Sequence, residues 1–317
     1  MTDPSSAPVV DLVEVGPRDG LQNEARTLSV ETRTALVERL VEGGVRRLEA
    51  VSFVRGDRVP QMADAEAVLA GLTPRDDVAL IGLVLNRRGA ERAAETICDE
   101  LNIVLPVTDD FATRNQGVTV EQGLEHAAAA VEVARQAGKR ASVTLAVAFG
   151  CPFQGQVPVA QVARVVERVA DLGIDELAFA DTIGVGVPSQ VHALAELVRG
   201  DARVPGLRFH FHNTRNTGYA NAWAATTLDL SGHGGRVSLD ASVGGFGGCP
   251  FAPAATGNIA TEDLLHLLRR SGVPVEGADV DALGSLVDTA SWLSGELDSP
   301  VQALLGRAGD LLGGAAS

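Results

Sequence analysis

Phe209-His210-Phe211-His212-Asn213-Thr214 places two histidines one residue apart in an apolar, aromatic run. Side chains alternate across a β-strand, so His210 and His212 project from one face and can bind one metal ion. A lone strand histidine is more often a core or rim residue, but a His-x-His pair at a strand end favours metal binding. In a parallel β/α architecture this end would meet Pro17-Arg18-Asp19-Gly20 after the first apolar run and Gly257-Asn258 after the last.

Short apolar runs alternate with amphipathic stretches on both sides of that strand. The strand-like runs are 9–15, 47–53, 78–85, 100–106, 142–149, 176–181, 207–212 and 236–243. The helical candidates are 32–42, 63–71, 89–96, 120–137, 159–172, 189–199, 219–228 and 261–270. Eight β/α units in about 250 residues have the size of a closed α/β fold, the (β/α)8 TIM barrel.

A doubly wound open sheet is the alternative, and the distribution of polar residues favours the barrel. In a barrel the carboxyl ends of all strands form the active face, whereas an open sheet gathers polar residues near one switch point. The polar residues at or near such ends are Arg18, Asp19, Glu49, Asp181, His210, His212 and Asp240. We therefore predict a TIM-barrel catalytic domain over residues 1–278 and a short C-terminal helical extension over 279–317 that packs on the barrel or serves a subunit contact.

Charge and composition exclude several classes of partner. The 26 basic and 41 acidic residues give a net charge of −15, which opposes binding to nucleic acid or to an anionic membrane surface. No apolar run reaches the roughly 18 residues of a membrane helix, and the start of the chain shows no secretion signal. The 3 cysteines, Cys98, Cys151 and Cys249, fit a reducing compartment. We expect a soluble cytoplasmic protein.

The predicted metal site combines one carboxylate, two imidazoles and one amide oxygen. These groups belong to Asp19, His210, His212 and Asn258. Such a mixed nitrogen and oxygen set leaves room for substrate oxygens and water, and it suits Mg²⁺ or Mn²⁺ better than a closed structural zinc site. The sequence therefore predicts a divalent-metal cofactor.

Three further residues are candidates for chemistry. Arg18 stands beside Asp19, where its guanidinium can stabilise an enolate oxygen, and it can also pair with Glu49. An acid such as Glu49 on an apolar strand needs a partner. The glycine-rich stretch 244–250 permits a moving lid whose reactive group would be Cys249, and the alternative is a plain turn with an inert thiol.

These motifs, in this order, resemble the 3-hydroxy-3-methylglutaryl-CoA (HMG-CoA) lyase family, within a wider group of metal-dependent barrel lyases and synthases. The resemblance runs from about Val9 to Leu268. Its most specific blocks are VGPRDGLQNE at 15–24, EAVSFV at 49–54, DTIGVG at 181–186, and GGCPFA at 247–252 leading to TGNIATED at 256–263.

The resemblance implies a set of roles. The implied metal ligands are Asp19, His210, His212 and Asn258. The implied catalytic residues are Arg18, Asp19, Glu49, His210 and Cys249, with Arg18 steadying a thioester enolate and His210 also taking part in proton transfer. The implied substrate-orienting residues are Gln22, Asp181 and Thr182, together with Glu49. An acyl-CoA is the implied substrate, and a homodimer or higher homo-oligomer is the expected assembly.

The implied reaction is the retro-Claisen cleavage of HMG-CoA to acetoacetate and acetyl-CoA, as in leucine breakdown. Asn213-Thr214-Arg215-Asn216 follows His212 where the family commonly has Asp-Thr-Tyr-Gly, so another branched 3-hydroxyacyl-CoA, such as citramalyl-CoA, is an alternative substrate. A synthase that joins acetyl-CoA to a 2-keto acid is a further alternative, and the Gly-Gly-Cys-Pro at 247–250 counts against it. The intact set of candidate residues argues against a barrel that keeps the metal but not catalysis.

Overall fold

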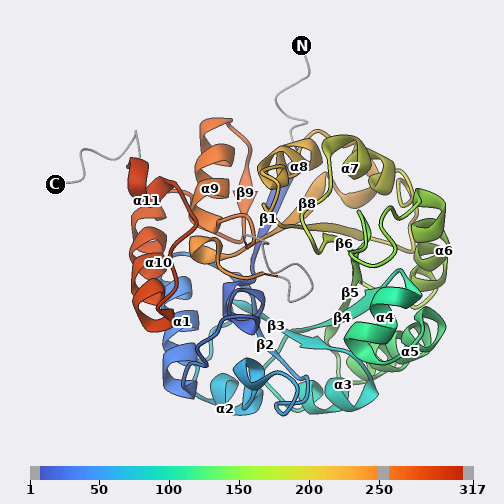
Figure 1. The fold of residues 1–317 in the computed structure, drawn as a ribbon, viewed down its shortest axis with the longest axis horizontal. Coiled ribbons are helices and arrows are strands. Elements are labelled where there is room, and N and C mark those ends of the chain that lie inside the picture. Colours follow the sequence, from blue (N-terminus) through green and yellow to red (C-terminus); the bar gives the residue numbers. More distant parts are fainter. Residues whose placement is uncertain (1–7, 249–256, 310–317) are drawn as a thin grey trace.

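Eight parallel strands form a closed ring in the computed structural model, which describes residues 8–248 and 257–309 (Figure 1). Each strand pairs with the next one along the chain, and β1 pairs with both β8 and β2, which closes the barrel. The strands are β1 (Val9–Glu14), β2 (Arg47–Ser52), β3 (Ala79–Val84), β4 (Glu100–Pro106), β5 (Arg140–Ala146), β6 (Glu176–Asp181), β7 (Gly206–Phe211) and β8 (Arg236–Ala241). The predicted TIM barrel is confirmed.

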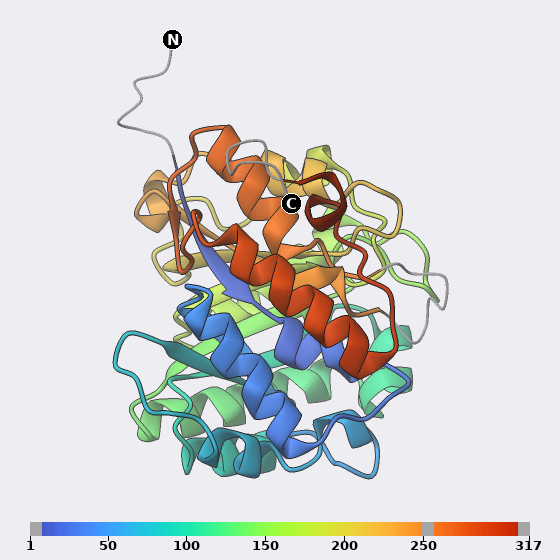
Figure 2. The same cartoon turned by 90° about the vertical axis from the view of Figure 1, so that its left-hand side faces the viewer.

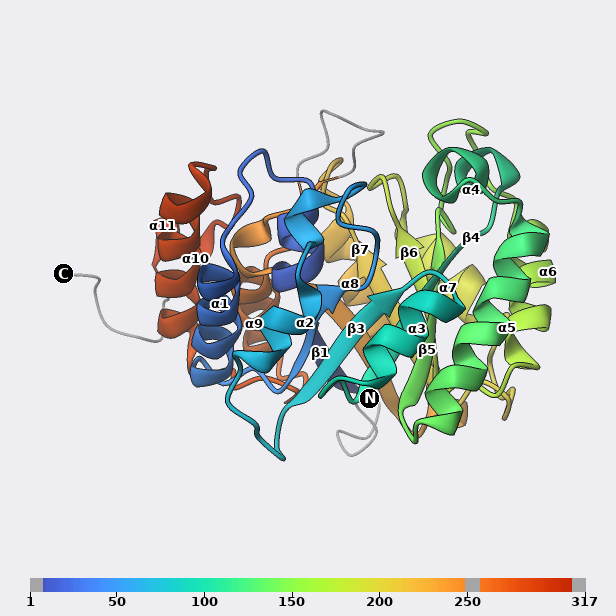
Figure 3. The same ribbon diagram turned by 90° about the horizontal axis from the view of Figure 1, so that it is seen from below.

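Helices follow every strand and lie outside the ring, and Figure 3 shows α1, α2, α3 and α5 along one side of it. These outer helices are α1 (Val30–Glu42), α2 (Ala65–Ala70), α3 (Arg87–Ala94), α5 (Val120–Gln136), α6 (Val159–Ala170), α7 (Pro188–Ala195), α8 (Gly218–Ala225) and α9 (Thr261–Arg270). Local signals set their starts: the Ser29 hydroxyl caps α1, and Thr119 and Gln122 form a reciprocal capping box on α5. In the described ranges no helix is long and apolar enough to cross a membrane.

The structure differs from the sequence prediction in several elements, among them α7, which ends at Ala195 rather than at residue 199, and α8, which ends at Ala225 rather than at residue 228. Helix α4 (Asp109–Gln116) precedes α5, capped by Thr108 and ended by Gly117, and the short strand β9 (Val275–Glu276) pairs with β1 outside the ring. Strand β5 ends at Ala146 rather than at residue 149, because Val147 adopts a φ of +57° that breaks the extended backbone.

The C-terminal part contains α10 (Leu283–Leu297) and α11 (Leu305–Ala308). Figure 2 shows α10 lying beside α1, and the contacts extend to α9. The Arg39 guanidinium of α1 stacks over the Trp292 ring of α10, with 4.6 Å between its carbon and the ring centroid. The predicted helical extension is therefore present and packs on the barrel, while a domain boundary at 278/279 stays a prediction.

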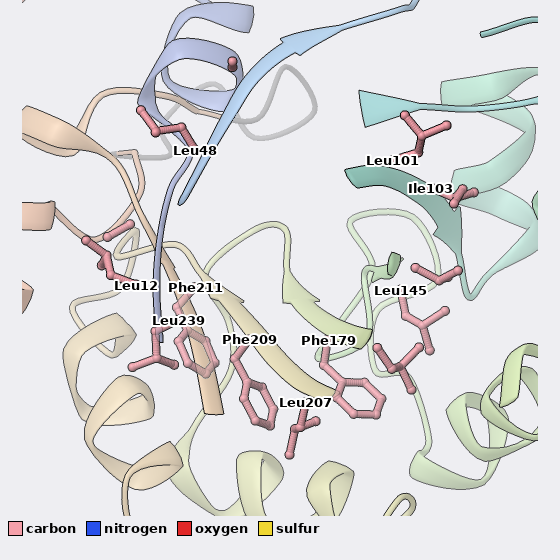
Figure 4. Packing of buried hydrophobic residues seen from close by; sticks show 14 of the residues in the cluster. Leu12, Leu48, Leu101, Ile103, Leu145, Phe179, Leu207, Phe209, Phe211 and Leu239 are labelled. Carbon is pink, nitrogen blue, oxygen red and sulfur yellow. The ribbon is translucent and has the colours of Figure 1, made fainter. Parts of the chain in front are cut away.

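The main hydrophobic core lies between the strands and the helices (Figure 4). Phe209 and Phe211 of β7 point into it, with ring centroids 5.6 Å apart. Alternation along β7 then turns Arg208 and His210 toward the barrel interior. That interior holds many buried charged and polar side chains, of which the clearest are Arg47, Glu49, Glu100, Asn102, Glu176, Arg208, Ser238 and Asp240. The outward packing of the apolar residues thus places the polar set under the carboxyl mouth.

Candidate active site and metal centre

A single π-type turn after β1 carries the first two site residues. The turn spans Gly16–Gly20, and the amides of Asp19 and Gly20 donate to the Val15 carbonyl at 2.7 and 3.2 Å. Arg18 and Asp19 are both buried inside this turn. The compact turn therefore presents a guanidinium and a carboxylate side by side at the carboxyl end of the first strand.

Asp19, His210 and His212 meet at one point, and their possible ligand atoms all lie within 4.8 Å of one another. Asp19 Oδ2 is 3.8 Å from His210 Nε2 and 3.5 Å from His212 Nε2. Burial would raise the pKa of Asp19, but the Arg18 charge and the two imidazoles hold it well below its usual range. The carboxylate is therefore ionised, as a metal ligand must be.

The position of His212 supports a metal at this point. It is buried, its Nε2 lies 3.5 Å from Asp19 Oδ2, and neither ring nitrogen makes a well-aligned hydrogen bond among residues 8–248 and 257–309. The buried His233 shares this lack of partners, so the weight rests on the convergence of His212 with Asp19 and His210. A buried polar atom without a partner costs free energy, which a coordinated cation would offset. The donor set of two imidazoles and one carboxylate fits a divalent metal with open positions.

Asn258 joins this group from the connection between β8 and α9. It forms an antiparallel bridge with His212, and its Nδ2 donates to Asp19 Oδ2 at 2.9 Å and to the Phe246 carbonyl at 3.0 Å. Gly247 packs against the same amide at a φ of +110°, and a Cβ there would lie 2.6 Å from Asn258 Nδ2. The amide is in place beside the carboxylate, and ligation through its oxygen stays a prediction.

Asp240 of β8 supports His210 from behind, with its Oδ2 3.0 Å from His210 Nδ1. This contact leaves His210 Nε2 directed at Asp19 and His212. Burial alone would lower the pKa of His210, but the hydrogen bond to Asp240 and the Asp19 charge outweigh it, so the pKa is raised. A carboxylate–imidazole pair of this kind fixes the ring orientation and strengthens the imidazole as a ligand.

Arg18 and Glu49 form the expected ion pair. Arg18 Nε donates to Glu49 Oε1 and its Nη1 donates to Asp19 Oδ1, and the other Glu49 oxygen accepts from Asn102 Nδ2 at 2.8 Å. Glu49 is fully buried on β2, so this pairing offsets the cost of its charge. Nη2 is the guanidinium nitrogen of Arg18 that no described residue binds, and it remains available to a substrate oxygen.

The predicted substrate-orienting residues have local partners. The Asp181 carboxylate accepts from the amides of Val185 and Gly186 at 2.9 and 2.8 Å, and thereby holds the turn between β6 and α7. The Thr182 hydroxyl accepts from the Val147 amide at 2.8 Å. Gln22 is half-buried just beyond the first turn, and Cys249 lies outside the described residues.

The structure therefore brings together six of the predicted site residues, which are Arg18, Asp19, Glu49, His210, His212 and Asn258. Three further residues of the site, with no role predicted from the sequence, contact Glu49 or His210: Asn102, Arg208 and Asp240. A signal existed for Arg208, because Arg208-x-His210-x-His212 has the two-residue period of a single strand face.

Comparison with known proteins identifies the family of the chain. The family model described as HMGL-like matches residues 9–289. The (R)-citramalyl-CoA lyase of Chloroflexus aurantiacus is 42% identical over 313 residues, which cover 95% of each chain. The hydroxymethylglutaryl-CoA lyase of Pseudomonas mevalonii is 38% identical over 277 residues, which cover 87% of this chain and 90% of the relative. A solved HMG-CoA lyase from Acinetobacter baumannii, in complex with coenzyme A and 3-methylmalate, matches with a TM-score of 0.87 at 35% identity over 100% of both chains. The chain therefore belongs to the HMGL-like family, in the HMG-CoA lyase group of carbon–carbon lyases.

Proposed function

We propose that the protein is a divalent-metal-dependent lyase that cleaves the C2–C3 bond of a branched 3-hydroxyacyl-CoA to a ketone and acetyl-CoA. The observation that carries the proposal is the buried group of Asp19, His210 and His212 directly beside the Arg18–Glu49 pair. When bound, Mg²⁺ or Mn²⁺ would supply Lewis acidity that lowers the cost of ionising the 3-hydroxyl group.

The residues of this chain supply orientation and charge for the cleavage. Asp240 fixes His210 so that its Nε2 faces the centre of the site, where it can bind the metal or move a proton. Glu49 and Asp19 hold Arg18 from two sides, so Nη2 can donate to the thioester oxygen as it becomes an enolate. A preorganised donor of this kind is worth about 3–4 kcal/mol in the transition state.

HMG-CoA is the first candidate substrate, because several of the relatives are named as lyases of that compound. (R)-Citramalyl-CoA is the second candidate, favoured by the relative that is 42% identical over 95% of both chains. Arg215 stands where the family commonly has a tyrosine, and it is the departure that we test for an effect on the acyl group. Its Nη1 donates to the carbonyls of Ile183 and Gly184 at 2.9 and 3.1 Å, so a cation stands on the loop after β7. Both candidate substrates carry one free carboxylate that such a cation can pair with, so its effect is to be read from the ratio of the two cleavage rates.

The test follows ketone and acetyl-CoA formation from both thioesters, with protein that has been stripped of metal and reloaded with Mn²⁺ or Mg²⁺. Acetoacetate from HMG-CoA supports the first candidate, and pyruvate from citramalyl-CoA supports the second. Arg215→Tyr should then change the ratio of the two kcat/KM values, while Arg58→Tyr, at an exposed position on another loop, should leave it unchanged. Failure to cleave either compound by a protein that binds Mn²⁺ would overturn the proposal.

Several expectations remain part of this proposal. They are the choice of metal, the orienting roles of Gln22, Asp181 and Thr182, the lid role of Cys249, the homodimer or higher homo-oligomer, a place in leucine breakdown, and the cytoplasmic location. The condensing-synthase alternative is tested in the same experiment by supplying acetyl-CoA with a 2-keto acid.

A further inference from the structure

Two arginines lie one above the other in the acidic interior of the barrel. The lower one, Arg47, begins β2, and its guanidinium reaches Glu176 at 2.7 Å, Glu100 at 2.8 Å and Asp11 at 2.8 Å. Glu100 and Glu176 begin β4 and β6, so this layer lies at the amino end of the barrel. Arg47 therefore neutralises buried acids far from the carboxyl mouth.

Arg208 lies between that layer and the active site. Its Nη1 is 3.9 Å from Glu100 and 3.8 Å from Glu176, its Nε donates to Asp240 Oδ1 at 2.5 Å, and its Nη2 donates to Glu49 Oε2 at 3.5 Å. The side chain is fully buried. A guanidinium can contact all four acids because its donors diverge in one rigid plane.

The contacts of Arg208 with Asp240 and Glu49 connect it to the active site. Asp240 uses its other oxygen, Oδ2, for His210 Nδ1, and Glu49 uses its other oxygen, Oε1, for Arg18 Nε. One guanidinium thus contacts the second oxygen of each carboxylate that orients a site residue, and at Glu49 it shares that oxygen with the shorter contact from Asn102 Nδ2, at 2.8 Å. Neither carboxylate can rotate without losing a charge-assisted hydrogen bond.

We propose that Arg208 is a positioning residue for the reaction, which sets the orientation of His210 through Asp240 and of Arg18 through Glu49. The inference rests on the proposed function of this site. The hydrogen-bond partners behind metal ligands typically contribute 10- to 100-fold to metal affinity, and Arg208 is the residue that anchors such a partner here. A lysine at 208 would keep the charge and lose the fork that contacts two acids at once.

The test measures Mn²⁺ binding without substrate, by electron paramagnetic resonance of free Mn²⁺, beside thermal stability and steady-state kinetics. Arg208→Lys should raise the Mn²⁺ Kd about tenfold, and it should lower kcat by a larger factor than it changes KM. Arg47→Lys is the matched control, because Arg47 contacts neither Asp240 nor Glu49 among the described residues. It should lower thermal stability to a similar degree and leave the Mn²⁺ Kd within about twofold of wild type.

A double-mutant cycle tests the route through Asp240. If Arg208 acts on the metal through Asp240, Arg208→Lys should have little further effect on the Mn²⁺ Kd in an Asp240→Asn background. An unchanged Kd and kcat in Arg208→Lys, or equal effects of the two lysine variants on the Kd, would overturn the inference. A wild-type protein that binds no Mn²⁺ would overturn the metal centre itself, which is a distinct result.

A charge-balanced pair keeps the test decisive if Arg208→Lys does not fold. Arg208→Met with Glu100→Gln removes one cation and one nearby anion, and Arg47→Met with Glu100→Gln removes the same acid with the other arginine. The first pair should weaken Mn²⁺ binding about tenfold relative to the second. Equal binding by the two pairs would overturn the inference.

Discussion

The Glu14 carboxylate at the end of β1 accepts a hydrogen bond of 2.6 Å from the hydroxyl of Thr261, the first residue of α9. Its other oxygen accepts from the amides of Gly16 and Val243 at 2.7 and 2.9 Å. One buried acid therefore ties the turn that carries the site residues to the connection that follows β8. The Glu262 carboxylate extends this link, because it accepts from the Gly244 amide at 3.0 Å.

Because Glu14 and Glu262 are buried acids, we expect the free energy of unfolding to depend on pH. Burial raises the pKa of Glu14 to about 7 and that of Glu262 to about 8, whereas an unfolded glutamate titrates near pH 4.3. The folded state holds the extra protons, so their stabilisation is complete below about pH 4 and is lost as the pH rises toward 8. Between pH 5 and 8 the free energy of unfolding of wild type should fall by at least about 2 kcal/mol more than that of Glu262→Gln.

Urea unfolding at both pH values measures this difference. Glu95→Gln is the control at an exposed surface position, and its free energy of unfolding should change between pH 5 and 8 as much as that of wild type. Parallel pH dependence of wild type and Glu262→Gln would contradict a raised pKa for Glu262.

Arg18→Met should fold and bind metal but lose most turnover. In the proposed reaction the Arg18 guanidinium would stabilise charge that develops only in the transition state, so kcat should fall by about 100- to 1,000-fold. The Mn²⁺ Kd should change by less, since Asp19, His210 and His212 remain. Steady-state kinetics with the better thioester make the measurement, and turnover like that of wild type would remove Arg18 from the enolate site.

His212→Ala should weaken stabilisation by metal. A ligand that binds only the folded state adds about 2.7 kcal/mol at 100 times its Kd, so saturating Mn²⁺ should raise the melting temperature of wild type clearly and that of His212→Ala much less. His233→Ala is the control, because His233 is also a buried histidine but lies in the turn before β8, away from the triad. The same Mn²⁺-induced shift in wild type and His212→Ala would exclude His212 as a ligand.

Gly247→Ala should damage the metal centre in addition to straining the backbone. Gly247 and Gly138 both have a positive φ, at +110° and +69°, so alanine should cost about 1 kcal/mol or more of stability at either position. A Cβ at 247 would also press on Asn258 Nδ2 and the Asp19 carbonyl, whereas one at 138 would meet nothing within 4 Å. We expect a higher Mn²⁺ Kd only for Gly247→Ala, and equal Mn²⁺ Kd values for the two variants would contradict this reading of the contact.

Local patterns were enough to predict the barrel. The strands are short, apolar and separated by amphipathic helices, and these features depend on residues that are near one another in the chain. The errors occur where the apolar pattern misleads or is weak, although Thr108 and Gly117 are local signals for the start and the end of α4. Val147 ends β5 through a positive φ that valine rarely adopts, and α4 buries only Phe111 and Ala112, which gives no clear helical stripe.

The histidine pair at the end of β7 was also visible in the sequence, because the two-residue period places His210 and His212 on one face whatever surrounds them. The hydrogen-bond partner of each buried polar side chain could not be predicted from the sequence. That Arg208 meets Asp240 and Glu49, or that Glu14 meets Thr261, depends on how strands distant in sequence are staggered when the sheet closes. Strand alternation assigns a residue to the barrel interior. Only closure of the ring sets its height along the barrel axis, and with it the side chains that neutralise its charge.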